Sequence, residues 1–183
     1  MSQYEPVYDV INPDPPTEAD RFIDKTLFAY IADNIKLESE ESMQHRNAIL
    51  AEVKRIFQEW VRFVATDILC LPEEDAQEAG GQLFISGSHR LGVREPGADI
   101  DTVCVAPRFC TREHFFSSLK DKFQNNPEVT NLNAIPGAAV PIMSFDFQGV
   151  SIDLLFARLS DNSVPETVDI IDDKILRNLD TAS

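Results

Sequence analysis

The sequence predicts an α+β fold in which a mixed, twisted β-sheet is backed by helices and preceded by N-terminal helices. Apolar residues recur at helical spacing through the first third of the chain, whereas short runs rich in β-branched and aromatic residues occur in the rest. Two of these runs, 140–147 and 150–156, are separated only by Gln148-Gly149, which is typical of a hairpin and requires antiparallel pairing. Helices first and strands later, with one helix between them, favour this class over a doubly wound parallel sheet.

Length and charge limit the possible functions. The 183 residues suit one domain or slightly more, and 16 basic against 31 acidic residues give a net charge of −15. Proteins that hold nucleic acid through its phosphates usually carry a basic surface, so any such role here needs another source of positive charge, for which a divalent cation is the obvious candidate. No apolar run approaches the ~18 residues of a membrane-spanning helix, so we expect no membrane partner.

The chain is expected to begin with an extended arm. Residues 1–16 hold four of the eleven prolines. Thr17 then offers a helix N-cap, with Asp20 three residues on as the second half of a capping box. Apolar residues continue at helical spacing from Ile23 to Ile35. We therefore divide the chain into an arm, 1–16, and one folded domain, 17–183.

The longest predicted helix runs from about Glu40 to Ile68. Ser39 marks its start, and the acidic residues that follow suit the positive end of the helix dipole. A single apolar stripe, expected to face the core, is made by Ile49, Val53, Ile56, Trp60 and Val64.

Shorter elements follow in the middle of the chain. We expect an acidic loop over 71–81, a strand over 83–86, a glycine-containing loop over 87–97 and a strand over 99–106.

A third helix and the C-terminal elements complete the prediction. Thr111 caps the helix, an aromatic stripe from Phe115 to Phe123 gives it one apolar face, and 125–127 ends it. After the hairpin, 160–165 is expected to be a loop and 172–178 to begin a short helix.

The Asp99-Ile100-Asp101 segment carries the first candidate for chemistry. Residues two apart on a strand point to the same face, so the two carboxylates would lie roughly 6–7 Å apart at Cα. Unneutralised, they would repel each other. Two Mg²⁺ ions ~3.5–4 Å apart would relieve that repulsion and require such oxygen ligands. Taken alone, the pair favours a solvated strand start in an acidic protein.

A third carboxylate, Asp153, interrupts an apolar strand. Because Ile152, Leu154 and Phe156 share one face of that strand, Asp153 lies on the other. Aspartate is depleted in strands and is rarely buried without a partner. It is either an edge charge, half of an ion pair with an arginine, or a third metal ligand.

Gly87-Ser88 is the last candidate. A glycine lets backbone N–H groups approach a phosphate closely, and the serine hydroxyl adds a donor, although this dipeptide is also a common turn. A phosphate cradle, a carboxylate pair on one strand and a third carboxylate on another are the parts that two-metal nucleotidyl transfer requires.

Two segments carry a resemblance to a known family. The stretches GSHRLGVREPGADIDTVCVAPRF and SIDLLFARL resemble the catalytic domain of eukaryotic poly(A) polymerase, a member of the DNA-polymerase-β-like nucleotidyltransferases. The resemblance extends from about Pro16 to Asp180. It implies the nucleotidyltransferase palm fold, with the helical central domain and the RNA-binding domain of the family lying outside these residues.

The resemblance also implies roles for the candidate residues. Asp99 and Asp101 would bind both of two Mg²⁺ or Mn²⁺ ions, and Asp153 only the ion at the attacking hydroxyl, which it would help to deprotonate. Residues assigned to nucleotide binding are Gly87, Ser88, Asp99, Ile100, Asp101 and Asp153. The implied reaction transfers AMP from ATP to an RNA 3′-hydroxyl during polyadenylation, in the nucleus and beside 3′-end processing factors.

Two alternatives stay open at this stage. A related enzyme could add uridine, CCA ends or a single nucleotide to a small molecule, although the PGADIDTVCVAPR segment argues against it. A truncated, non-catalytic binding or regulatory module could keep the palm fold and act through protein contacts. The intact acid trio argues against that module, because a protein released from catalysis has no need of three clustered carboxylates.

Overall fold

The structure, a computed structural model, describes residues 12–35, 37–93, 95–170, 175 and 179, and the chain divides into two units, Met1–Leu37 and Glu38–Ser183. The first unit contains α1, Glu18–Asn34. Its predicted capping box is present: Thr17 Oγ1 accepts a hydrogen bond from the Asp20 N–H, and Asp20 Oδ2 accepts one from the Thr17 N–H at 2.8 Å. Residues 12–16 of the predicted arm contain no helix or strand, and the rest of the arm lies outside the described residues.

The α1 helix buries none of its side chains. Several of its apolar residues, including Phe22, Ile23 and Leu27, are more than half exposed. Helical spacing therefore predicted the helix correctly, although the spacing by itself does not determine what the apolar face contacts.

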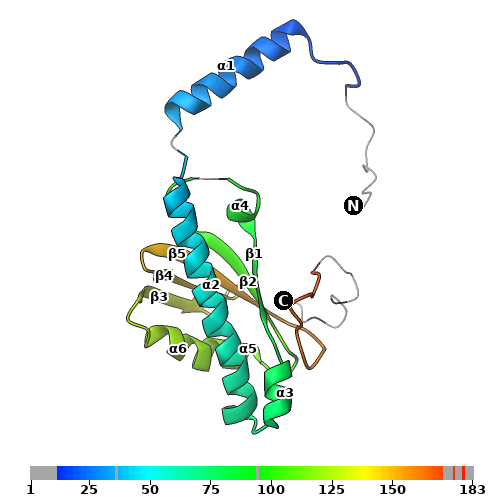
Figure 1. Cartoon of the computed structure of the whole chain (residues 1–183), viewed down its shortest axis with the longest axis vertical. Coiled ribbons are helices and arrows are strands. Elements are labelled where there is room, and N and C mark those ends of the chain that lie inside the picture. Colours follow the sequence, from blue (N-terminus) through cyan, green and yellow to red (C-terminus); the bar gives the residue numbers. More distant parts are fainter. Residues whose placement is uncertain (1–11, 36, 94, 171–174, 176–178, 180–183) are drawn as a thin grey trace. The chain divides into compact units, whose positions relative to one another are not determined.

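The second unit is built on a five-stranded sheet with the order β1-β2-β5-β4-β3 (Figure 1). The strands are β1 Gln82–Ile85, β2 Ile100–Ala106, β3 Val129–Ile135, β4 Ile142–Phe147 and β5 Val150–Arg158. Neighbouring β2 and β5 run parallel, and every other neighbouring pair is antiparallel. The predicted α+β class with a mixed sheet is confirmed.

The predicted long helix is confirmed as α2, Glu40–Phe63, which continues into a π-helical turn, η1, at Val64–Ile68. Ser39 is its N-cap and accepts a hydrogen bond from the backbone of Ser42 at 3.1 Å. All five residues of the predicted stripe are buried: Ile49, Val53, Ile56, Trp60 and Val64. The stripe is therefore the core face of this helix.

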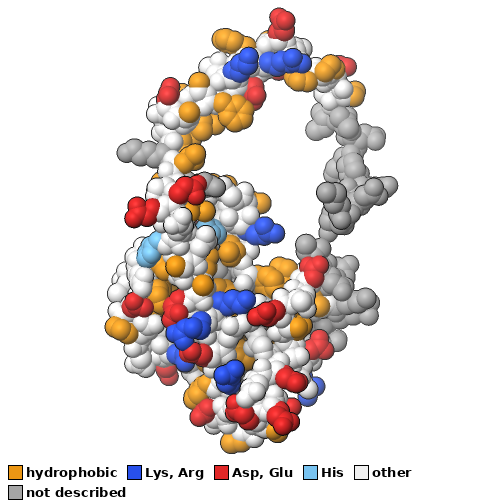
Figure 2. Space-filling view, viewed as in Figure 1, with side chains coloured by type: hydrophobic (Ala, Val, Ile, Leu, Met, Phe, Trp, Pro, Cys, Tyr) orange, Lys and Arg blue, Asp and Glu red, His pale blue; other side chains and the backbone are white. Residues whose placement is uncertain are grey.

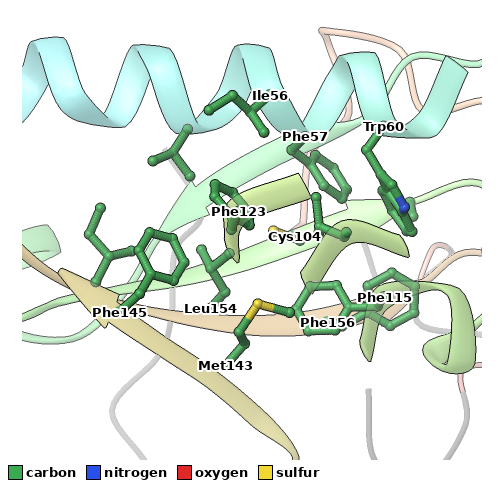
Figure 3. Close-up of a cluster of buried hydrophobic side chains, with 14 of the residues drawn as sticks. Ile56, Phe57, Trp60, Cys104, Phe115, Phe123, Met143, Phe145, Leu154 and Phe156 are labelled. Carbon is green, nitrogen blue, oxygen red and sulfur yellow. The ribbon is translucent and has the colours of Figure 1, made fainter. Parts of the chain in front are cut away.

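Aromatic side chains fill the space between α2 and the sheet (Figure 3). Trp60 is fully buried; it stacks on Phe57 at 5.5 Å between ring centroids and meets Phe115 and Phe156 edge-on. Its indole N–H donates to Ser118 Oγ at 2.8 Å, so the polar end of the ring is satisfied inside the core. This packing fixes the sheet against α2, and thereby fixes the strands that carry the site.

The third predicted helix is present in three consecutive pieces: α5 Arg112–His114, the π-helical η2 Phe115–Leu119 and α6 Lys120–Gln124. Thr111 caps it as predicted, by accepting from the His114 N–H at 3.1 Å. The Gln148-Gly149 hairpin is also confirmed. Both turn residues have positive φ, 48° and 81°, as a tight turn between antiparallel strands requires.

Four predictions about shorter elements need correction. Residues 71–81 are not all loop, because α3 forms at Glu73–Glu78, where acidic residues in the first turn favour a helix start. Gly87–Arg90 forms the short helix α4 inside the expected glycine loop. The strand expected over 83–86 begins and ends one residue earlier. The strand expected from Asp99 begins at Ile100, so Asp99 precedes it.

Strand β3 was not predicted at all. Its sequence is rich in asparagine, which is uncommon in strands, and Asn131 has a φ of 55° at a shift in register against β4. The hydrogen bonds to β4 hold these residues in the sheet despite their low strand propensity. The helix expected over 172–178 lies outside the described residues apart from Ile175, which is in a turn.

Candidate active site

Three carboxylates meet at the start of the central parallel pair. Asp101 on β2 and Asp153 on β5 are direct register partners, and Asp99 lies immediately before β2. Strand alternation places these side chains on the face opposite α2, because Ile100 and Ile152 occupy the core face. One ligand oxygen from each of the three carboxylates lies within 4.8 Å of the others. The sequence prediction that they share one place is met by the geometry.

Mutual repulsion perturbs the middle carboxylate. Burial raises the pKa of Asp101, and the negative charges of Asp99 and Asp153 raise it further. A cation bound among the three oxygens would reverse this effect, because it favours the ionised form of every member. A cluster of carboxylate oxygens is also the donor set that Mg²⁺ and Mn²⁺ prefer, so the residues fit a divalent-metal site.

The turn after β1 packs directly on this cluster. Gly87 has a φ of 61°, and a Cβ added to it would lie 1.9 Å from Asp101 Oδ2. The neighbouring Ser86 N–H donates to the Asp101 backbone carbonyl at 2.8 Å. The glycine is therefore required both by its backbone conformation and by the closeness of the carboxylate. Ser88 follows it, so the predicted Gly-Ser element adjoins the acid trio.

A cavity of about 220 Å³ extends from the trio across β4 and β5. Its lining residues are Asp99, Asn131, Ser144, Phe145, Asp146, Ser151, Ile152 and Asp153. Asp146 accepts hydrogen bonds from Ser151 Oγ and Asn131 Nδ2, each at 2.6 Å, and the two bonds lower its pKa. The cavity thus offers ionised and hydroxyl groups in a row beside the carboxylates.

Four polar residues that line this cavity were not predicted from the sequence: Asn131, Ser144, Asp146 and Ser151. Ser144 is the register partner of Asp153, and Asp146 that of Ser151, so alternation along the predicted hairpin was a usable signal for both pairs. No such signal existed for Asn131, because its strand was not predicted.

Figure 2 shows the face of the molecule that carries α2, where Lys and Arg side chains are interspersed with Asp and Glu. Separately, no helix among the described residues is both long and apolar enough to cross a membrane.

Solved structures share this fold. The structure described as mtPAP in complex with ATPγS has a TM-score of 0.50 at 18% identity, covering 85% of this chain and 35% of that one. A structure of Cid1, described with an RNA terminal uridylyl transferase activity, has a TM-score of 0.52 at 15% identity, covering 73% and 36%. These two likenesses show the fold, a mixed five-stranded sheet, which in this chain gathers three carboxylates near the start of the β2–β5 pairing.

Residues 7–183 match the poly(A) polymerase nucleotidyltransferase domain family, and the chain belongs to that family. It is 41% identical to nuclear poly(A) polymerase 1 of Arabidopsis thaliana over 166 residues, which are 90% of this chain and 23% of that protein. It is 39% identical to poly(A) polymerase pla1 of Schizosaccharomyces pombe, and 36% identical to poly(A) polymerase PAPalpha of Candida albicans. These matches cover 91% and 95% of this chain, but only 29% and 31% of those proteins. The resemblance noted from the sequence is confirmed.

Metal binding is expected to stabilise the folded chain. Mn²⁺ bound by the trio adds about 2.7 kcal/mol at a free concentration 100 times its Kd, which corresponds to roughly 5–10 °C in Tm for a chain of this size. The measurement is a thermal melt across a Mn²⁺ titration. The variant Asp153→Ala should lose most of the shift, and an equal shift in that variant would place the metal elsewhere.

Proposed function

We propose that this chain is the catalytic domain of a polynucleotide adenylyltransferase, which transfers AMP from ATP to an RNA 3′-hydroxyl in the polyadenylation of mRNA. The observation that carries the proposal is the convergence of Asp99, Asp101 and Asp153 beside Gly87 in a chain of this family. The chain spans between 23% and 31% of the length of its curated relatives, so the activity of those whole proteins is carried over here as a proposal.

The reaction assigns a separate task to each part of the site. The 3′-hydroxyl oxygen forms a bond to the α-phosphorus of ATP, and the bond from that phosphorus to the β-phosphate oxygen breaks. Pyrophosphate leaves with the electron pair. Two bound Mg²⁺ or Mn²⁺ ions would neutralise the charge on the reacting phosphoryl group. Asp99 and Asp101 would hold both ions, and Asp153 would hold the ion at the attacking hydroxyl and help to remove the proton of that hydroxyl.

Nucleotide binding falls to the segment beside the trio. Gly87 and Ser88 present backbone and hydroxyl donors to the triphosphate. Ile100 contributes through its backbone between Asp99 and Asp101, because its side chain lies in the core. Because Gly87 lacks a side chain, its backbone can lie directly against the Asp101 carboxylate. The cations also reconcile an anionic nucleotide with a chain of net charge −15.

The cellular setting follows from the same proposal. The substrates are ATP and an RNA 3′ end, and the partners are 3′-end processing factors in the nucleus. One of the similar proteins is named a nuclear poly(A) polymerase, which supports this location.

The test is primer extension by the chain with radiolabelled ATP, an oligoadenylate primer and Mg²⁺ or Mn²⁺. Extension by ATP that Asp99→Ala abolishes would support the proposal. Parallel reactions with UTP, CTP and GTP separate adenylyl transfer from the other nucleotidyl transfers, and preferred extension by UTP would contradict the choice of ATP. Inertness with normal metal binding would favour a non-catalytic module that keeps the fold.

A further inference from the structure

An ion pair is buried beside the site without touching the acid trio. Arg46 on α2 and Glu38, two residues before the α2 start, lie 3.5 Å apart between Nε and Oε2, and each side chain is only 5% exposed. Ser42 Oγ donates to the other carboxylate oxygen of Glu38 at 2.6 Å. Burying two charges is costly, and such a pair seldom adds net stability over apolar residues of the same size. A net gain in stability therefore does not account for the pair, and its place in the structure points to a positional use.

The guanidinium group of Arg46 also contacts the segment that leads into the active site. Arg46 Nη2 donates a hydrogen bond of 2.6 Å to the backbone carbonyl of Ala98, the residue immediately before Asp99. Burial lowers the pKa of His89 on α4, and the positive charge of the Arg46 guanidinium lowers it further. One buried cation therefore adjoins both segments that lead into the site.

The three carboxylates differ in how their backbones are held. Asp101 and Asp153 lie inside paired strands and are each other's register partners. Asp99 lies outside β2, and the segment before it contains Gly97, with a φ of 77°. Rotation of the peptide between Ala98 and Asp99 would turn the Asp99 carboxylate away from the other two. The hydrogen bond from Arg46 holds the carbonyl of that peptide.

We propose that Arg46, held by Glu38, is a positioning residue that fixes the peptide before Asp99 and so completes the divalent-cation site. The inference deepens the proposed function, on which it rests for the role of the trio as metal ligands. It assigns to α2 a part in the site in addition to its part in the core.

The test measures Mn²⁺ affinity by the loss of the free-ion electron paramagnetic resonance signal, with folding checked by circular dichroism. Because Arg46→Met alone leaves the Glu38 charge buried without its partner, which destabilises the fold, the main variant is the pair Arg46→Met with Glu38→Leu, which removes both charges together. We expect its Kd for Mn²⁺ to rise at least tenfold. Arg46→Lys, which keeps a charged donor, should recover part of the affinity.

A matched control lies on the same helix. Arg55 pairs with Glu52 and Glu59 on the exposed side of α2, and Arg55→Met should leave the Kd within twofold of the unaltered chain. A Kd within twofold for the folded Arg46→Met, Glu38→Leu chain as well would overturn the inference.

Combining removal of the Arg46–Glu38 pair with a change at Asp99 distinguishes a role in positioning Asp99 from a general loosening of the fold. In an Asp99→Asn background, which retains one oxygen ligand, removing the Arg46–Glu38 pair should change the Kd by less than twofold, whereas in an Asp153→Asn background it should still raise it. An equal rise in both backgrounds would contradict the positioning role. The readout needs neither ATP nor RNA. A chain that binds Mn²⁺ in this way but does not extend a primer would refute the proposed function and leave this inference standing.

Discussion

Asp101→Asn is expected to lower nucleotidyl transfer on the order of 10³-fold or more while leaving the metal-free fold as stable as before, or more stable. Asp101 is the central member of the trio, next to Asp153 across the strands and two residues from Asp99. Removing its charge weakens the site for both cations, and the loss of one electrostatic group aimed at a transition state costs on the order of 10²–10³-fold in rate. The same change removes a carboxylate that repels two neighbours, so the folded chain gains by it.

The sign of the stability change follows from the raised pKa of Asp101. A carboxyl group with a higher pKa in the folded than in the unfolded state destabilises the fold when it is ionised. Its contribution is therefore least favourable at neutral pH, and it vanishes as the pH falls below the ordinary value of 3.8. In thermal melts with a chelator present, the Tm values of the unaltered chain and of Asp101→Asn should differ most near pH 7. A clear fall in the Tm of Asp101→Asn at that pH would contradict this account.

Asp146 provides the control of opposite sign. Its pKa is lowered by hydrogen bonds from Ser151 and Asn131, so its ionised form stabilises the fold. Asp146→Asn should lose stability at neutral pH, and the difference should shrink as the pH falls and the carboxyl group of the unaltered chain is protonated. Changes in Tm of opposite sign for Asp101→Asn and Asp146→Asn, two aspartates on one sheet face, would separate repulsion at the site from a general effect of lower net charge.

The fold was predictable where one face of an element is buried. The stripe from Ile49 to Val64 defined α2, because a helix that packs on a sheet must repeat its apolar residues at helical spacing. The hairpin could be predicted from Gln148-Gly149, because the preference of such residues for a tight turn is local. Strand β3 was not readable, because its asparagines are held by pairing with β4 and no local preference reveals that pairing.

The residues of the candidate site likewise include some that the sequence could reveal and some that it could not. Asp153 was noticeable because a charge inside an apolar strand is unusual, and the Asp99–Asp101 spacing placed a pair on one face. Arg46 could not be found from the sequence, because its partner carbonyl at Ala98 lies 52 residues along the chain and backbone carbonyls carry no sequence signature. The sequence also did not reveal that Asp99 lies outside β2. This position is what gives Arg46 a role.

Gly87→Ala is expected to lower nucleotidyl transfer at least about 100-fold and to weaken Mn²⁺ binding. Its Cβ would lie 1.9 Å from Asp101 Oδ2, and 2.9 Å from the carboxyl carbon, so the carboxylate has to move from its place in the trio. The positive φ of 61° adds a backbone cost of about 1–2 kcal/mol for any residue with a Cβ. Primer extension, Mn²⁺ affinity and thermal melts on the same preparations measure the three effects.

Gly92 separates the contact from the backbone cost. Its φ is 76°, close to that of Gly87, but no described atom lies within 4 Å of a Cβ added there. Gly92→Ala should therefore lose similar stability while retaining its Mn²⁺ affinity and its rate of primer extension. If both alanine variants lose activity together, strain in the turn is responsible and the packing of Gly87 on Asp101 is not. If only Gly87→Ala loses activity, the absence of a side chain at Gly87 is what keeps Asp101 in place beside Asp99 and Asp153.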